Sequence, residues 1–299
     1  MLWIPVTVFA AFAQTVRNAA QRHLVTELGT LGATLVRFLY GLPFAAAWLA
    51  IVVTVTHTAI PAPTLVFFGW CVLGAVSQVA GTALLLQTMR ARNFAVGVAY
   101  SKTEVVQVAV LSVTLLGDPL SLRVAAAVAA GTVGVLLLAP ADPQRPFRSL
   151  VDGFTSRAAL LGLGCGAGLA MASVAFRGAA LALPTTSFLV AAAAALVVAQ
   201  TMQTVMLGGW LLARSPEVVV RTLKAWRVSL FAGFMGAAAS VGWFTAFAIQ
   251  PVTSVRTLGL IEMVFSYGVS RRFFREQITR RELAGMAMLA LGVVIVTLS

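Results

Sequence analysis

Charged residues are scarce in this 299-residue chain, at 10% of the total against about 25% in ordinary soluble domains. Cysteine is scarcer still: Cys71 and Cys165 both lie in apolar stretches, which excludes a disulfide framework. His23 and His57 have no metal-like spacing around them, so we predict neither a metal site nor another cofactor. No charged region precedes the first apolar stretch, and residues 2–21 are therefore expected to remain as a membrane span rather than be cleaved as a signal peptide.

Hydrophobic residues make up 60% of the chain. They form stretches of about 20 residues, and each stretch can cross a hydrocarbon core about 30 Å thick. This pattern predicts an all-α, multi-pass membrane protein with ten transmembrane helices. The expected spans cover approximately residues 2–21, 33–55, 64–88, 94–116, 121–139, 158–178, 185–212, 227–249, 253–271 and 280–298.

The longest break between spans contains three prolines and mixed charge, which is typical of a linker. It divides the chain into a first five-helix repeat at 1–140, a linker loop at 141–157 and a second five-helix repeat at 158–299. Because five is an odd number, the second repeat is expected to be inverted relative to the first.

Acidic residues occupy matching positions in the two halves. Glu104 and Glu262 are 158 residues apart, and so are Asp118 and Glu276, each of which follows its glutamate by 14 residues. Fourteen helical residues span about 21 Å. If Asp118 and Glu276 mark the membrane surface, Glu104 and Glu262 lie near the middle of the hydrocarbon core. An ionisable side chain at that depth is expensive and is by default a candidate functional group.

Lys102 precedes Glu104 by two residues and points to the opposite side of the helix, whereas Tyr100 and Gln107 share the face of Glu104. Desolvation favours the protonated form of an unpaired carboxylate, so we consider protons as a coupling ion. The alternative is a static ion pair between helices, in which Lys102 or Arg256 neutralises one carboxylate.

Further polar and aromatic side chains within the spans are candidates for substrate binding or coupling: Gln14, Arg17, Asn18, Gln78, Trp243 and Arg256. The first three share one face of the first span. Gln78 is alternatively a hydrogen-bonding group between helices, and Arg17 is alternatively a side chain that reaches the membrane surface. Arg37, near the start of the second span, is expected at the surface for the same reason.

Basic residues are concentrated in the loops after odd-numbered spans, which hold fifteen, whereas the loops after even-numbered spans hold only Arg123. The positive-inside rule then puts the odd loops in the cytoplasm and both termini outside. Most of the basic residues that give the chain its net charge of +12 lie in these short loops. This distribution predicts contact with a lipid bilayer and argues against a nucleic-acid partner.

Two segments carry a family resemblance: residues 115–121 with Gly131 and Gly134-Val135, and residues 274–279 with Gly285 and Gly292-Val293. They resemble the paired Gly-Glu-x-hydrophobic-Ser/Thr … Gly … Gly-Val segments of EamA-type ten-helix transporters in the drug/metabolite transporter (DMT) superfamily. Asp118 and Arg275 depart from that pattern. The resemblance implies a central cavity between the halves, secondary-active movement of small metabolites, most often export, and both termini in the cytoplasm, opposite to the charge count.

The sequence therefore predicts a transporter of the inner (cytoplasmic) membrane, a monomer or homodimer, that moves a small polar metabolite by alternating access. Charges of both signs near one cavity favour a zwitterion such as an amino acid as the small-molecule substrate. The alternative is an accessory or structural membrane protein, or a channel, in which the midplane charges form static ion pairs. No nucleophile, metal cluster or pair of surface acids points to an enzyme.

Overall fold

The computed structural model describes residues 2–104, 106–107, isolated positions between 122 and 137, and residues 156–184, 187–250 and 252–297. Within these ranges the chain is helical and contains no strand. Asp118 and residues 141–155 of the predicted linker lie outside them, as does most of the predicted fifth span. The helices are α1 (Trp3–Leu39), α2 (Leu42–Thr56), α3 (Leu65–Ala91), α4 (Phe94–Ser101), α8 (Arg157–Leu181), α9 (Phe188–Arg214), α10 (Pro216–Lys224), α11 (Trp226–Ile249), α12 (Val252–Leu258), α13 (Ile261–Arg272) and α14 (Arg280–Thr297).

The first helix is longer than hydropathy indicates. α1 continues beyond residue 21 and breaks at Gly29, whose φ of 71° lies in the left-handed region that favours glycine. The chain reverses there, and Gln21 Nε2 donates a hydrogen bond across the reversal to the carbonyl oxygen of Ala33 at 2.7 Å. Helical hydrogen bonds therefore continue beyond the predicted first span, since hydropathy marks only where the apolar stretch ends.

The fourth and ninth predicted spans are both interrupted. α4 ends at Ser101, Lys102 adopts a turn, and helical geometry then resumes. α12 and α13 are separated by Gly259 and Leu260, so the single helix expected over 253–271 is wrong in this detail. A Cβ atom at Gly259 would lie 2.8 Å from the ring of Trp243, so only glycine allows this approach.

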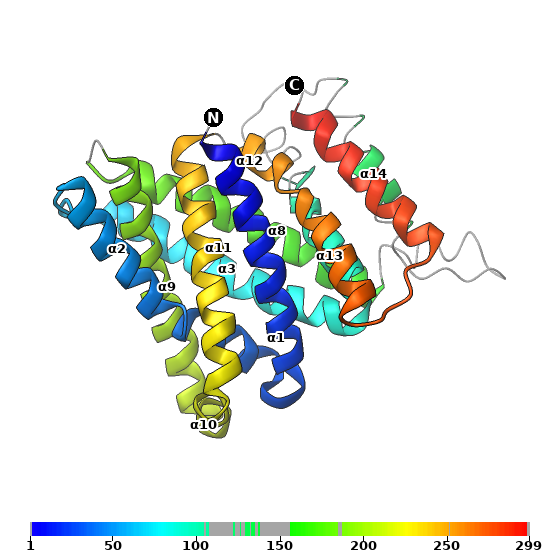
Figure 1. Cartoon of the computed structure of the whole chain (residues 1–299), viewed down its shortest axis with the longest axis horizontal. Coiled ribbons are helices and arrows are strands. Elements are labelled where there is room, and N and C mark those ends of the chain that lie inside the picture. The colour runs from blue at the N-terminus through cyan, green and yellow to red at the C-terminus, as the bar shows by residue number, and fades with distance from the viewer. Residues whose placement is uncertain are drawn as a thin grey trace.

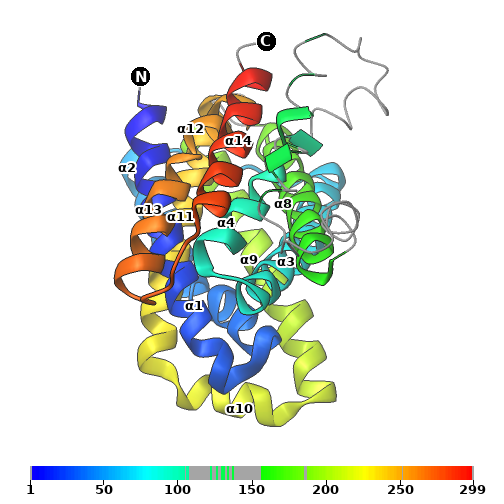
Figure 2. The same cartoon turned by 90° about the vertical axis from the view of Figure 1, so that its right-hand side faces the viewer.

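The loop expected between the seventh and eighth spans contains the short helix α10. Pro216 occupies its first turn, where the missing N–H has no cost. Val219 is buried on one face, whereas Val220 and Leu223 are exposed. Figure 2 shows α10 at one end of the molecule, roughly across the long helices. Hydropathy alone did not separate this amphipathic segment from a loop.

Two helix pairs join distant parts of the chain. α1 packs along α11, and α3 packs along α8 (Figure 1). Glycine allows the contact between α3 and α8: a Cβ atom at Gly168 would lie 2.9 Å from the carbonyl oxygen of Ser77 on α3. Small residues therefore permit close helix contact here, as in other membrane helix pairs.

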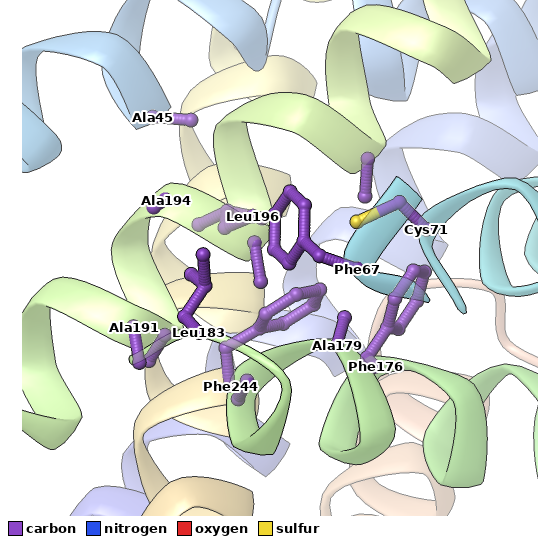
Figure 3. Packing of buried hydrophobic residues seen from close by; sticks show 14 of the residues in the cluster. Ala45, Phe67, Cys71, Phe176, Ala179, Leu183, Ala191, Ala194, Leu196 and Phe244 are labelled. Carbon is purple, nitrogen blue, oxygen red and sulfur yellow. The ribbon is translucent and has the colours of Figure 1, made fainter. Parts of the chain in front are cut away.

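A cluster of buried hydrophobic residues joins several of the helices. Phe67 of α3, Phe176 of α8 and Phe244 of α11 meet alanine-rich α9 (Figure 3). The rings of Phe176 and Phe244 have centroids 4.7 Å apart. Cys71 is buried in the same cluster and is a free thiol, as the sequence predicts.

Among the described residues, five helical segments are long and apolar enough to cross a membrane, by length and composition. They are Trp3–Thr56, Leu65–Ala91, Arg157–Leu181, Phe188–Arg214 and Trp226–Ile249. The all-α class and the membrane-like character of the chain are confirmed. Ten spans arranged as two inverted repeats stay a prediction.

Candidate functional site

Glu262 is fully buried, and both of its carboxylate oxygens accept hydrogen bonds. Lys102 Nζ forms an ion pair with Oε2. Gln14 Nε2 donates to the same oxygen at 2.8 Å, and Asn18 Nδ2 donates to Oε1 at 3.2 Å. The carboxylate of the second half is therefore neutralised and held entirely by residues of the first half.

The network extends beyond this carboxylate in two directions. Trp243 Nε1 donates to Gln14 Oε1 at 2.9 Å, which fixes the orientation of the amide. Arg17 Nη2 donates to Asn18 Oδ1 at 2.7 Å. The side chain of Arg17 is 2% exposed, and its Nη1 has no hydrogen-bond partner among the described residues. Arg17 therefore does not reach the membrane surface, which was the alternative for it.

Glu104 has fewer partners. Arg256 Nη1 lies 3.2 Å from its Oε1, whereas its Oε2 is buried without a hydrogen-bond partner in the described part of the chain. Arg256 Nη2 also donates to Ser173 Oγ. The guanidinium carbon of Arg256 lies 4.8 Å from the ring centroid of Trp243 and 5.1 Å from that of Phe247, within the range of cation–π attraction.

The two ion pairs cross between the halves. Lys102 of the first half binds Glu262 of the second, and Arg256 of the second half binds Glu104 of the first. This is the arrangement offered above as the static alternative, with both cations engaged. Each carboxylate therefore has a cationic partner from the other half of the chain.

A cavity lies beside the crossed pairs. Its volume is about 30 Å³, measured as the space open to the centre of a water molecule. That is enough for water and too little for an organic substrate in this conformation. The polar groups around it include the side chains of Gln14, Arg17, Arg37, Gln78, Thr82, Ser173, Ser240 and Arg256, and the aromatic groups are Phe176, Trp243, Phe244 and Phe247. No described carboxylate lines it.

The predicted site residues separate into two groups. Most of them belong to the ion-pair network or line the cavity. Gln78 lines the cavity and also accepts a hydrogen bond from Gln203 Nε2 at 2.7 Å. Tyr100 and Gln107 do not line it. Gln107 instead donates to the carbonyl oxygen of Leu163 at 3.0 Å, and this hydrogen bond joins it to α8.

Arg37 was placed wrongly by the sequence analysis. It is 4% exposed, lines the cavity and donates from Nη1 to Thr82 Oγ1 at 2.9 Å. The expected surface position assumed that the second span begins near residue 33. The helix in fact resumes directly after Gly29, so Arg37 lies about two turns inside it. The position of Arg37 eight residues after Gly29 was the sequence signal that could have indicated its burial.

Salt bridges join the two halves at one end of the assembly. Arg22 on α1 lies 2.5 Å from Glu276, and Arg92 lies 2.8 Å from Glu282. The backbone N–H of Phe94 and the hydroxyl of Ser270 also donate to Glu276. Burial alone would raise the pKa of Glu276, but these hydrogen bonds and the Arg22 charge lower it overall below its ordinary value of 4.5.

No family model matches this chain, and no curated protein is similar to it. Its fold is similar to that of a protein in a crystal structure, with a TM-score of 0.57 and 17% sequence identity over 98% of both chains. The description of that structure names no activity, so the similarity shows the fold alone.

Proposed function

We propose that this chain is a multi-pass transporter of the cytoplasmic membrane. It moves a small polar metabolite by alternating access between two inverted halves of five spans each. The observation that carries the proposal is the pair of crossed ion pairs beside a cavity, because each pair joins one half to the other. Intramembrane charges that face a cavity mark substrate or ion pathways in transporters.

The helix contacts support an inverted repeat. α1 packs on α11 and α8 packs on α3, so the first helix of each half lies against the third helix of the other. Lys102 and Leu260, at the two helix interruptions, are 158 residues apart, as are Glu104 and Glu262. Discontinuous helices at matching positions of two repeats are typical of substrate sites in secondary transporters.

The salt bridges at one end supply a closed gate. Arg22 and Arg92 follow the first and third predicted spans, and their acidic partners lie after the ninth. These loops belong to the odd-numbered set, which holds fifteen of the sixteen basic residues counted in loops, so this end is the cytoplasmic one by the positive-inside rule. In the proposed cycle, breaking the Arg22–Glu276 and Arg92–Glu282 pairs opens the cavity to that side.

A structural or accessory role without a substrate is the second candidate. The full pairing of both midplane carboxylates favours it, because static ion pairs also neutralise buried charge. The two candidates differ in whether the end gate must open.

A reducible crosslink across the gate distinguishes them. The double variant Arg22→Cys/Glu276→Cys is reconstituted in vesicles and treated with a bis-methanethiosulfonate reagent, which joins the two thiols through disulfide bonds and spans the gap left by the Arg22 and Glu276 side chains. Uptake of labelled amino acids, carboxylates and phosphate monoesters is measured, and we expect uptake of at least one class by the wild type, its loss on crosslinking of the double variant and its return on reduction. The native thiols Cys71 and Cys165 are buried and give little background. The two single-cysteine variants control for loss of the ion pair.

Uptake that continues at the wild-type rate with the crosslink formed would contradict alternating access through this gate. No uptake of any class by wild-type protein in either membrane orientation would favour the structural role.

A further inference from the structure

The interior of this protein contains more positive than negative charge. Four cationic side chains lie around the cavity and the crossed pairs: Arg17, Arg37, Lys102 and Arg256. Only two carboxylates, those of Glu104 and Glu262, lie with them. Two positive charges therefore remain uncompensated.

The other acidic residues do not supply the balance. Glu27 and Glu217 are exposed at the loop end, and Glu276 and Glu282 are engaged by Arg22 and Arg92. The three aspartates of the chain are outside the described residues, at the end of the predicted fourth span and in the linker. The charge excess is therefore not removed by any carboxylate in the described part of the chain.

The excess is located on Arg17 and Arg37. A Cβ atom at Gly236 of α11 would lie 3.2 Å from Arg17 Cδ and 3.5 Å from Arg37 Cγ, so the two arginine stems lie side by side over this glycine. Arg17 Nη1 and Arg37 Nε have no hydrogen-bond partner among the described residues. The partners that the two guanidinium groups do have, Asn18 and Thr82, are uncharged.

Unpaired buried cations of this kind are costly. The penalty for taking a charge out of water is several kcal/mol unless an opposite charge lies close by. Two like charges placed side by side add repulsion. An anion bound in the cavity would therefore stabilise the folded chain, because it would neutralise the two buried arginines.

We propose that this cavity binds a small dianion through Arg17 and Arg37, with Arg256 completing the site. The anionic groups are two carboxylates or one phosphate monoester, because two negative charges balance the excess. Arginine suits both, since its planar fork donates two parallel hydrogen bonds to one carboxylate or phosphate. This inference rests on the proposed transport function and names its substrate class; it replaces the zwitterion expected from the sequence.

Neighbouring groups orient the site. Trp243 and Phe247 hold the Arg256 guanidinium by their ring faces. Thr82 and Gln78 of α3 add polar groups to the lining of the same cavity. The cavity is too small for an organic dianion as it stands, so binding requires the halves to separate, which the gate between Arg22 and Glu276 permits.

The test is a thermal-unfolding measurement on the purified full chain with succinate, glycerol 3-phosphate, inorganic phosphate, lactate, alanine and choline. We expect succinate or glycerol 3-phosphate to raise the midpoint by several degrees at 100 times its dissociation constant. Lactate should have a smaller effect, and alanine and choline none. Stabilisation by succinate alone identifies a dicarboxylate site, and stabilisation by glycerol 3-phosphate together with phosphate identifies a phosphate site.

The variants Arg17→Gln and Arg37→Gln locate the site. Each should weaken the apparent affinity for the dianion about tenfold or more, because each removes charged hydrogen bonds to it. Each should also be at least as stable as the wild type without ligand, because repulsion between the two cations is relieved. Arg221→Gln, which removes a cation of the same type from α10, is the matched control and should change neither property.

Vesicle uptake separates this inference from the transport proposal. Uptake of alanine or choline without binding or uptake of any dianion would overturn the dianion site and leave the transporter intact. Dianion binding that depends on both arginines, without uptake, would support the site and contradict transport. Absence of dianion stabilisation in the wild type, or its persistence in both arginine variants, would overturn the inference.

Discussion

Glu262 and Glu104 are the two carboxylates of the crossed ion pairs, yet their surroundings differ. Glu262 accepts hydrogen bonds from Lys102, Gln14 and Asn18, and both of its oxygens are satisfied. Glu104 has one cationic partner, Arg256 at 3.2 Å, and a buried oxygen without a described partner. The two glutamate side chains therefore lie in two different environments.

The difference assigns different tasks to the two carboxylates. A saturated ion pair with both oxygens bonded is held firmly and fixes the packing of the helices that supply its partners. A carboxylate with one partner and a free oxygen can change partners at lower cost. We therefore expect Glu262 to dominate stability and Glu104 to be the group that changes state during transport.

The largest expected effect comes from Glu262→Gln. It leaves the Lys102 ammonium buried without a counter-ion, and breaking a buried pair in this way costs about 3–5 kcal/mol. Glu104→Gln should cost less, about 1–2 kcal/mol, because Arg256 keeps its hydrogen bond to Ser173 and its contact with two aromatic rings. Thermal unfolding of both variants in the same detergent measures the difference.

The double variant Lys102→Gln/Glu262→Gln is the control for this comparison. Removing both charges should restore part of the stability lost in Glu262→Gln, because no uncompensated cation remains. Equal losses in the two single glutamine variants would contradict the distinction between the carboxylates.

A smaller effect is expected at the Arg22–Glu276 pair, where the comparison is between a fully buried ion pair and a partly exposed one. The pKa of Glu276 is lowered in the folded state, so its contribution to stability is complete above the unfolded pKa near 4.5 and is lost as pH falls through the folded value. Glu276→Gln should lower the free energy of unfolding by about 1.5–3 kcal/mol at pH 7. The free energy of unfolding of this variant should also fall less steeply below pH 4.5 than that of the wild type.

Unfolding midpoints measured from pH 3 to pH 7 check this prediction. Glu27→Gln is the matched control, since Glu27 is exposed and forms no described ion pair. An unchanged pH dependence in Glu276→Gln, or the same change in Glu27→Gln, would show that Glu276 does not contribute as the geometry indicates.

The sequence identified the ionisable residues well because a charge in an apolar stretch is conspicuous wherever the chain folds. Glu104, Glu262, Lys102 and Arg256 were all recognised in this way. Their pairing was not predictable, because the partners are 152 and 160 residues apart along the chain. The pairing of cations with carboxylates depends on how α4, α12 and α13 pack. The local sequence does not predict that packing.

Arg37 and the helix interruptions show a second limit. Hydropathy places a span to within a few residues, and the break at Gly29 moved Arg37 from the expected surface into the cavity wall. The breaks at Lys102 and at Gly259 occur where charges and a tryptophan ring approach the backbone. Such contacts are made by residues of other helices, so the local hydrophobic periodicity does not reveal them.

The smallest expected effect concerns Ser173, which contacts Arg256 of the weaker ion pair, Arg256–Glu104. Ser173→Ala removes the hydroxyl that accepts from Arg256 and should lower stability by about 0.5–1.5 kcal/mol, the net value of one hydrogen bond. Ser266→Ala is its counterpart one turn after Glu262, where the hydroxyl is buried with no hydrogen-bond partner among the described residues, so its removal should cost nothing. If Glu104 is the carboxylate that changes partners during transport, Ser173→Ala should also alter the rate of uptake, because a less restrained Arg256 binds Glu104 differently. Uptake rates of both alanine variants equal to that of the wild type would place the mobile step elsewhere in the protein.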